Sequence, residues 1–487
     1  MTTSTKPQNQ SAPSESGGAR AATVPVVSRW LTLRRSVAMV RNPIPLLTAM
    51  LDEHGDTVRM YLGGVRPMWL TRDAGLTQHV LQKNARNYAK SAITRSFAHY
   101  VGHGLLTNEG ADWLRQRRLI QPGFHRQRVA GLSALMQNII AETLAPLVRQ
   151  AGQQGGSVEI PALATMTRLT FRIIMRSVFS TSLAEAELER AATLITELQA
   201  FFVRRLRQPY LKPWFWLLGR TRYHDQVIAE LRALLRGYIV RRQQAAVLTA
   251  DPAAAPDDLL QMLLDARYED SGEPMSAERL LDEALILVIA GHETSANALT
   301  WLLRLLAEHP AEAAHIQTEA DALLGPPRRA GRAPTFADLP QLGRALNAVQ
   351  EALRLYPPAW MVDRVALADD EYQGLRIPKG TLFSIYLYAL HHDPKSWAAP
   401  EAFRPARFAP EAADAGPARH PFAYAPFGGG PRLCIGMQFA LTEMQLVVLE
   451  LLRQFRIEEV SGQPPAELLP LITLRPRADF QVRLRLR

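Results

Sequence analysis

The sequence is poor in cysteine, because Cys434 is the only one in 487 residues. A single thiol excludes an internal disulfide framework and a thiolate-rich zinc site, and it gives no reason to expect an oxidising compartment. No segment reaches the run of about eighteen apolar residues that a membrane-spanning helix needs. The N-terminal residues also lack the apolar core of a secretory signal. We therefore expect a cytoplasmic protein without a transmembrane anchor.

Several common motifs of catalysis and nucleotide binding are also missing. The sequence has no GxxxxGK[ST] phosphate loop, no GxGxxG after a predicted strand and no GxSxG nucleophile elbow. The segment HETSA starts at His292 like the HExxH helix of zinc proteases, but its fifth residue is Ala296 instead of a second histidine. These absences leave redox chemistry as a function to consider. Such a protein would have no nicotinamide site of its own.

The composition is that of a folded globular protein, with 47% hydrophobic and 21% charged residues. Lys and Arg number 56 and Asp and Glu number 46, which gives a formal net charge of +10. The arginines are spread along the whole chain and form no single basic tract. This distribution favours a basic face for an acidic partner protein over nucleic-acid binding.

The chain divides into a short leader and one large domain. Residues 1–24 are polar and rich in Ser, Pro and Gly, which predicts a disordered leader before a domain over residues 25–487. Thr57–Leu62 and Arg66–Thr71 predict a β-hairpin closed by a glycine pair, and residues 371–389 form a second strand-rich patch. Helical spacing dominates elsewhere. The expected fold class is mainly α with small β-sheets (α+β).

One predicted helix is unusually long and apolar. Ser276 is a candidate N-cap, and Pro310 ends the pattern more than thirty residues later. Residues 284–290 are apolar on all sides, so we expect this stretch to be buried all round. The pattern then breaks at residues 291–294 (GHET). A glycine, an acid and a hydroxyl are unfavourable in a buried helix, and such violations are expected at functional sites.

The single cysteine lies in the segment FGGGPRLCIG, residues 427–436. Its glycines allow the backbone to approach a flat or bulky group closely. Arg432 could meet an anion, and a helical pattern begins after Gly436, so a helix N-terminus would stabilise the Cys434 thiolate. A thiolate that ligates iron fits this arrangement. A buried, inert cysteine in a glycine turn is the alternative.

These residues resemble the haem-binding signature of the cytochrome P450 family, and the resemblance extends over nearly the whole chain. Glu351-Ala352-Leu353-Arg354 is similar to the ExxR helix of the family. Residues 403–408 (FRPARF) are similar to the loop whose arginine, here Arg407, completes a Glu–Arg–Arg network, although the family more often has Glu at Ala406. The resemblance implies a cytochrome P450 fold that binds haem b (iron protoporphyrin IX), with glycines that make room for the porphyrin.

The resemblance also assigns residues around the haem. Trp113 and Arg117 match a WxxxR helix, and Arg364 matches an arginine on the strand after the ExxR helix. Together with Arg432 they would hold the haem carboxylates, and a surface role is the alternative for Arg117. The implied haem-contacting set is Trp113, Arg117, Ala290, Gly291, Arg364, Phe427, Arg432, Cys434 and Gly436, with Cys434 as the metal ligand.

Glu293 and Thr294 match an acid–alcohol pair that the family carries in its central helix, beside the place where oxygen binds. The resemblance implies that the helix opens locally at this pair and that both residues are catalytic. Thr294 would hydrogen-bond the oxygen or a water molecule, and Glu293 would relay protons. A plain helix hydroxyl is the alternative for Thr294.

The implied function is an oxygen-dependent monooxygenase that hydroxylates or epoxidises an apolar small molecule, such as a fatty acid, terpene or polyketide of secondary metabolism. A peroxygenase that uses peroxide directly is one alternative. A non-catalytic haem or lipid carrier is another, although a carrier has no use for Glu293 and Thr294. Because no flavin or nicotinamide domain is fused, electrons would come from a ferredoxin or flavodoxin with its reductase.

The implied partner would dock on a basic surface of a monomeric enzyme. Its candidate residues are Arg115, Arg118, Arg126 and Arg128, and a solvated basic face without a partner is the alternative. By the same resemblance, residues 90–104, 288–290 and 359–361 would line the substrate pocket. Residues 198–218 are rich in aromatic residues and arginine, and a pocket lid, core packing and membrane-surface contact are open roles. Their aromatic residues are Phe201, Phe202, Tyr210, Trp214, Phe215 and Trp216.

Overall fold

The computed structural model describes residues 23–62, 66–180, 185–249, 258–326, 331–410 and 419–487. The predicted leader lies outside the described residues except for its last two positions, and so does the glycine pair of the hairpin.

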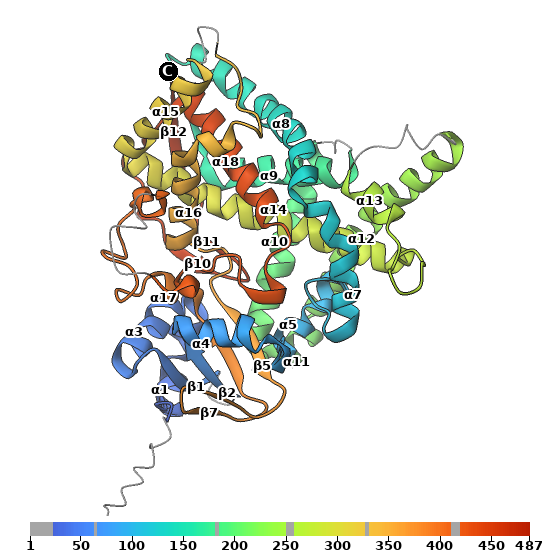
Figure 1. Ribbon diagram of the computed structural model, residues 1–487, viewed down its shortest axis with the longest axis vertical. Helices are drawn as coiled ribbons and strands as arrows, with labels where there is room; N and C mark the ends of the chain where they lie inside the picture. The colour runs from blue at the N-terminus through green and yellow to red at the C-terminus, as the bar shows by residue number, and fades with distance from the viewer. Residues whose placement is uncertain (1–22, 63–65, 181–184, 250–257, 327–330, 411–418) are drawn as a thin grey trace, which may run out of the picture.

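Helices form most of the described chain and small β-sheets form a minor part, as expected (Figure 1). The α-helices are α1 (Arg29–Arg34), α2 (Ser36–Arg41), α3 (Ile44–His54), α4 (Ala74–Gln78), α5 (Ala92–Ser96), α6 (Ala98–Val101), α7 (Gly110–Ile120), α8 (Arg126–Gln153), α9 (Ala162–Phe179), α10 (Glu185–Arg207), α11 (Lys212–Leu217), α12 (Arg220–Thr249), α13 (Leu259–Asp265), α14 (Ala277–Glu308), α15 (Pro310–Leu324), α16 (Gly343–Leu355), α17 (Leu387–His391) and α18 (Met437–Gln454). Shorter helical segments are η1 (His79–Lys83), η2 (Ala85–Asn87), η3 (Gln121–Phe124), η4 (Pro209–Leu211), η6 (Leu339–Gln341), η7 (Pro405–Phe408), η9 (Pro421–Ala423) and η10 (Gly430–Arg432).

The strands form four small sheets within the described residues. They are β1 (Thr57–Leu62), β2 (Arg66–Thr71), β3 (Tyr88–Ala89), β4 (Ser157–Pro161), β5 (Val362–Ala366), β6 (Asp370–Tyr372), β7 (Leu375–Ile377), β8 (Leu382–Ile385), β9 (Phe455–Glu459), β10 (Leu468–Pro470), β11 (Leu474–Pro476) and β12 (Gln481–Leu486). The largest sheet has the order β1-β2-β8-β5-β3, the next has β4-β12-β9, and β6-β7 and β10-β11 are two-stranded.

The predicted hairpin is confirmed, because β1 and β2 pair antiparallel with Thr57 opposite Thr71 and Leu62 opposite Arg66. The strand-rich patch at residues 371–389 is confirmed only in part. It contains β7 and β8, but its last residues begin helix α17, in which Leu387 and Leu390 are fully buried. Burial on several sides suits a helical turn there better than an alternating strand.

Helix α14 crosses the middle of the molecule and packs against α9, α16 and α18 (Figure 1). Its start is confirmed, since Ser276 accepts a hydrogen bond from the N–H of Arg279 at 3.3 Å. The expected local opening at residues 291–294 is wrong, because the helix is continuous there. A Cβ at Gly291 would lie 2.8 Å from Cδ1 of Ile174, so this glycine allows α14 to pack closely on α9.

One helix of the described chain, α8, is long and apolar enough to cross a membrane by its length and composition. Its buried residues belong to the main hydrophobic core, and it packs against α9 and α18. Core helices of folded proteins meet the same criteria, so we interpret α8 as one of them.

Candidate active site

The loop that carries Cys434 is held close to the rest of the chain by its own backbone. The N–H of Cys434 donates to the carbonyl oxygen of the half-buried Phe427 at 3.0 Å. A Cβ at Gly430, where φ is +64°, would lie 1.9 Å from the carbonyl oxygen of Leu81 in η1. A Cβ at Gly429 would lie 2.4 Å from the Phe422 ring. These two glycines therefore make room for the protein itself, which corrects the expectation that they make room for a porphyrin.

The Cys434 thiol is accessible although protein atoms surround it on most sides. Burial raises the pKa of Cys434, and the N–H of Gly436 and the guanidinium of Arg117 offset this only in part. The Gly436 N–H at the start of the following helix thus favours the thiolate as expected, but desolvation outweighs this contribution in the cofactor-free chain. An accessible but desolvated thiol is expected on the wall of an enclosed space.

Helix α14 is buried over most of its length but is accessible at one turn. Residues 281–289 are all buried, whereas Ala290 is exposed and Gly291 and Thr294 are half-buried. Ala290 and Thr294 are one turn apart and share a face of the helix. The hydroxyl of Thr294 donates to the carbonyl oxygen of Ala290 at 2.8 Å. This helical turn is accessible while the turns before it are closed by packing.

Arg432 lies within the Cys434 loop, in η10, and packs on Trp113 of α7. Its guanidinium carbon is 3.7 Å from the centre of the Trp113 ring. Its Nη1 donates to the carbonyl oxygen of Asn108 at 2.9 Å, and its Nη2 donates to the Glu109 carboxylate at 2.5 Å. On the same helix, Nη1 of Arg117 donates to the carbonyl oxygen of Leu433 at 3.0 Å. Trp113 and Arg117, the two α7 residues predicted from sequence, therefore both contact the cysteine loop.

Two more cations complete this group. Arg364 lies on β5, and among the described residues its one hydrogen bond runs from Nη1 to the carbonyl oxygen of Asp363 at 2.7 Å. Lys90 is buried, and its Nζ donates to the carbonyl oxygens of Leu105 and Leu106. Sequence reasoning missed Lys90, because no motif marks it and only the fold brings it here. The cationic cluster comprises Lys90, Arg117, Arg364 and Arg432.

The cationic cluster has more positive than negative charge. The Glu109 carboxylate acts on Lys90, Arg364 and Arg432, and the Asp363 carboxylate acts on Lys90 and Arg364. Burial and the neighbouring cations lower the pKa of Lys90 to about 7, and burial lowers that of Arg432 to about 10. Burial also lowers the pKa of the other two. The four basic side chains outnumber their two carboxylates, which suits the two carboxylates of haem b, and Cys434 offers a ligand for its iron.

Glu293 points away from Thr294, toward α10 and the turn between β10 and β11. Its Oε1 accepts a hydrogen bond from the hydroxyl of Thr473 at 2.7 Å, and its Oε2 accepts one from Nε2 of Gln199. Asn297 donates from Nδ2 to the Thr473 hydroxyl at 3.0 Å. The structure thus joins Glu293 to three buried residues that sequence reasoning missed, since they lie on three different elements and form no local motif.

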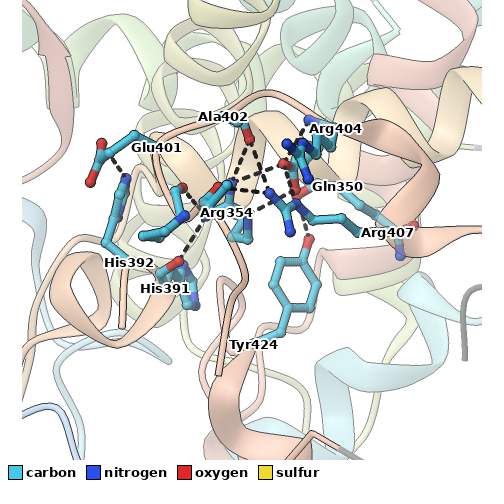
Figure 2. Close-up of polar contacts among 12 residues, drawn as sticks. Gln350, Arg354, His391, His392, Glu401, Ala402, Arg404, Arg407 and Tyr424 are labelled. Atoms are coloured by element: carbon cyan, nitrogen blue, oxygen red, sulfur yellow. Dashed lines mark hydrogen bonds and ion pairs between the residues drawn. The ribbon is translucent and has the colours of Figure 1, made fainter. Parts of the chain in front are cut away.

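The Glu–Arg–Arg network is present and complete. Arg354 donates from Nε and Nη2 to the two carboxylate oxygens of Glu351, both at 2.8 Å. Nε of Arg407 donates to the same carboxylate at 3.1 Å (Figure 2). The remaining N–H groups of Arg354 donate to carbonyl oxygens of His391, Pro400 and Ala402. The expectation that Ala406 does not disturb this network is confirmed.

His391 connects this network to the cysteine loop. Its carbonyl oxygen accepts from Arg354, and its Nε2 accepts from the N–H of Ala425 at 2.9 Å. Burial lowers the pKa of His391 to about 3, so the ring is neutral and can accept this hydrogen bond. The hydroxyl of Tyr424 donates to the carbonyl oxygen of Gln350 at 3.0 Å. The chain that leads to Cys434 is therefore fixed on α16.

The aromatic segment at residues 198–218 has two parts. Phe201, Phe202 and Phe215 are buried in the main core, whereas Tyr210, Trp214 and Trp216 are exposed. Core packing thus accounts for half of the aromatic side chains.

The predicted basic surface on α7 is partly neutralised. Arg115 lies 2.8 Å from the Asp270 carboxylate, measured from Nη2 to Oδ1, and Arg118 lies 3.6 Å from the Glu269 carboxylate. Pairing with acids lowers the net charge that an approaching protein would meet.

A family model described as Cytochrome P450 matches residues 23–483. The chain is 34% identical to cyclooctatin synthase of Streptomyces melanosporofaciens over 88% of each protein. It is 32% identical to cyclooctat-9-en-7-ol 5-monooxygenase of the same organism, again over 88% of each. It is 33% identical to putative cytochrome P450 132 of Mycobacterium tuberculosis, over 83% of this chain and 85% of that protein.

Proposed function

The chain belongs to the cytochrome P450 family and is a haem b-dependent monooxygenase, and we propose that it inserts one oxygen atom from O2 into an apolar, terpene-like small molecule. The observation that carries the proposal is an accessible, desolvated thiol beside four basic side chains that outnumber their two carboxylates. A terpene-like skeleton is favoured over a fatty acid or polyketide, because one relative is named for oxygenating cyclooctat-9-en-7-ol.

The proposed roles follow from the contacts of each residue. Cys434 would bind the haem iron, and the cationic cluster would hold the haem carboxylates, with Trp113 supporting Arg432. When bound, the haem supplies oxygen activation and insertion into unactivated C–H bonds. The Thr294 hydroxyl is on an accessible turn of α14, so it would exchange its bond to Ala290 for one to oxygen or water.

Glu293 would act behind Thr294 as the proton source. Its carboxylate is held by Gln199 and Thr473, and it makes no direct hydrogen bond to Thr294 within the described residues. Proton delivery from Glu293 would therefore require a bridging water or a change of its rotamer.

Thiolate ligation is tested by the absorption spectrum of the reduced, carbon-monoxide-bound protein. We expect a strongly red-shifted Soret band in the wild type and its loss in Cys434→Ala. A folded wild-type protein that takes up no haem would contradict the proposal.

The role of Thr294 is tested by the coupling of electron consumption to product. We expect Thr294→Ala to lower the product formed per electron pair by about tenfold or more, with peroxide released instead. The matched control is Thr300→Ala on the same helix, because the Thr300 hydroxyl makes the same type of bond, to the carbonyl oxygen of Ala296 at 2.7 Å, but is fully buried. Equal coupling in wild type and Thr294→Ala would remove Thr294 from the mechanism, and equal turnover with peroxide alone would favour the peroxygenase.

The electron donor is proposed to be a ferredoxin or flavodoxin with its reductase. Since Arg115 and Arg118 are paired with acids, Arg126 at the start of α8 is the better candidate for contact with it. We expect the electron-transfer rate to fall as the salt concentration rises, because salt screens such contacts. A rate that does not depend on salt would exclude an electrostatic docking surface. The cytoplasmic location and the monomeric state stay predictions.

A further inference from the structure

An acidic residue, Asp363, stands directly before Arg364 on β5. A carboxylate in this position works against the proposed haem site, because it attracts the cations of the cluster and repels the haem carboxylates. Its charge acts on both Lys90 and Arg364. The hydrogen bonds of these two cations nevertheless run to the backbone. Arg364 donates to the carbonyl oxygen of Asp363, and Lys90 donates to the carbonyl oxygens of Leu105 and Leu106.

Two hydroxyl groups occupy the Asp363 carboxylate instead. Its Oδ1 accepts a hydrogen bond from the hydroxyl of Thr94 at 2.6 Å, and its Oδ2 accepts one from the hydroxyl of Ser91. Ser91 is fully buried, whereas Thr94 and Asp363 are half-buried. A hydroxyl satisfies a carboxylate oxygen without bringing a positive charge to it. Each carboxylate oxygen of Asp363 therefore has a neutral partner.

The register of the largest sheet brings these hydroxyls to Asp363. The antiparallel pairing of β3 with β5 ends with Ala89 opposite Val365. The chain continues in the same direction, so Ser91 reaches Asp363 and begins α5 as its N-cap, close to β5 (Figure 1). Thr94 follows in the first turn of α5 and presents its hydroxyl to the same carboxylate. One short turn of helix thus supplies both donors.

The second acid near the cationic cluster, Glu109, is held in a different way. Its carboxylate forms an ion pair with Arg432 at 2.5 Å and accepts from the N–H of Lys90 at 3.0 Å. A haem carboxylate at Arg432 would therefore share this cation with an acid of the protein. At Lys90 and Arg364 it would meet cations whose neighbouring acid, Asp363, is already occupied by hydroxyls.

We propose that the hydroxyls of Ser91 and Thr94 are positioning groups for haem binding. They hold the Asp363 carboxylate away from the cations of the cluster and leave these cations available to the haem carboxylates. This inference rests on the proposed role of the cationic cluster. It also links the cofactor to the substrate side, because the same hydroxyls fix the first turn of α5, within residues 90–104 that are expected to line the pocket.

Transfer of haem from the loaded, full-length protein to excess apomyoglobin tests the proposal. Thr94→Val removes one hydroxyl and frees the carboxylate to pair with the cations. We expect haem to dissociate about three- to tenfold faster, the effect of about one hydrogen bond. Thr94→Ser keeps the hydroxyl and should keep the wild-type rate. Ser96→Ala is the matched control in the same helix, because the Ser96 hydroxyl donates to the carbonyl oxygen of Ile93 at 2.7 Å.

The charge of Asp363 distinguishes this proposal from a purely structural role of the hydroxyls. In Asp363→Asn no carboxylate competes for the cations, so haem should dissociate no faster than from the wild type. Adding Thr94→Val to Asp363→Asn should then have almost no further effect. If the hydroxyl only fixed α5, Thr94→Val would accelerate the loss of haem equally with aspartate and with asparagine at position 363.

Three results would overturn the proposal. They are a wild-type dissociation rate in Thr94→Val, an equal acceleration in Thr94→Ser, and an equal effect of Thr94→Val in the Asp363→Asn background. The melting temperatures of the cofactor-free variants should stay near that of the wild type, which shows that faster loss of haem does not come from unfolding. An unchanged rate in Arg364→Met would instead overturn the proposed role of the cluster itself.

Discussion

Two buried groups of charge differ in how the protein satisfies them. In the Glu–Arg–Arg network, all five N–H groups of Arg354 have acceptors, and the side chains of Glu351 and Arg354 are 0% exposed. In the cationic cluster, two carboxylates act on three of the four cations, and burial lowers the pKa of each cation. The first group is satisfied within the chain, whereas the second has more cations than carboxylates, as the proposed haem site requires.

The balance of charge distinguishes the structural network from the proposed ligand site. Both groups contain arginines on regular elements, and both have motifs in the sequence. A buried ion pair that is fully hydrogen-bonded fixes the elements it joins, and its loss leaves an unpaired charge. A buried cation without sufficient counter-charge destabilises the empty protein and stabilises the complex with an anion. Removing a charged residue should therefore lower the stability of the protein in the first group, and should leave the stability of the cofactor-free protein unchanged or raise it in the second.

The largest effect is expected from Glu351→Gln, which leaves Arg354 and Arg407 buried without their carboxylate. The free energy of unfolding should fall by about 3–5 kcal/mol. Urea unfolding of the haem-loaded protein, followed by circular dichroism, measures it. Glu230→Gln is the control, because it breaks an exposed pair with Arg190 and should change stability little. Similar stability in both variants would show that the network does not hold the fold.

A smaller and opposite effect is expected from Arg364→Met in the cationic cluster. The melting temperature of the cofactor-free protein should stay the same or rise, because one of several mutually repelling cations is removed. Haem should dissociate about 10–100-fold faster, which corresponds to a lost hydrogen bond to a charged group of about 1.5–3 kcal/mol. Transfer of haem to excess apomyoglobin measures the dissociation rate. Arg364→Lys should bring this rate part of the way back to the wild-type value. A large loss of stability without haem would place Arg364 with the structural network.

The third effect, small when taken per pH unit, is the pH dependence of the stability of the cofactor-free protein. The pKa of Lys90 is about 7 in the folded chain, below the value near 10.4 of an exposed lysine. Between these two pH values the Lys90 side chain is protonated in the unfolded chain and neutral in the folded chain. The free energy of unfolding therefore rises with pH in this range, and burial of Lys90 lowers it most below pH 7. The stability of the wild type relative to Lys90→Met should therefore rise by up to about 1.4 kcal/mol per pH unit between about pH 7 and 10, as the penalty in the wild type is relieved. A difference that stays constant from pH 7 to 10 would show that Lys90 is protonated when folded.

The sequence was sufficient where the signal is local. Alternation predicted β1 and β2, and an N-cap serine predicted the start of α14, whereas the Glu–Arg–Arg network was predicted through the resemblance to the family. It was insufficient where tertiary packing decides. Gly429 and Gly430 carry no sign that Phe422 and Leu81 are their neighbours.

The same limit applies to the partners of the site. Lys90, Gln199 and Thr473 lie far apart in the chain, in segments without a recognisable pattern, so no spacing rule could collect them. The raised pKa of Cys434 was missed for a related reason. A helix terminus can be read from sequence, but the desolvation that outweighs it depends on every segment packed around the thiol.

The glycines of the cysteine loop set the freedom that an engineer has at this site. Gly430 tolerates no side chain, because the Leu81 oxygen occupies the place of its Cβ, and Gly428 has space but a φ of +72° that suits few other residues. Gly436 differs, since its φ is −86° and a methyl group there would meet nothing of the protein closer than 3.9 Å. A library that tunes the surroundings of the sulfur should therefore vary position 436 and leave 428 and 430 fixed.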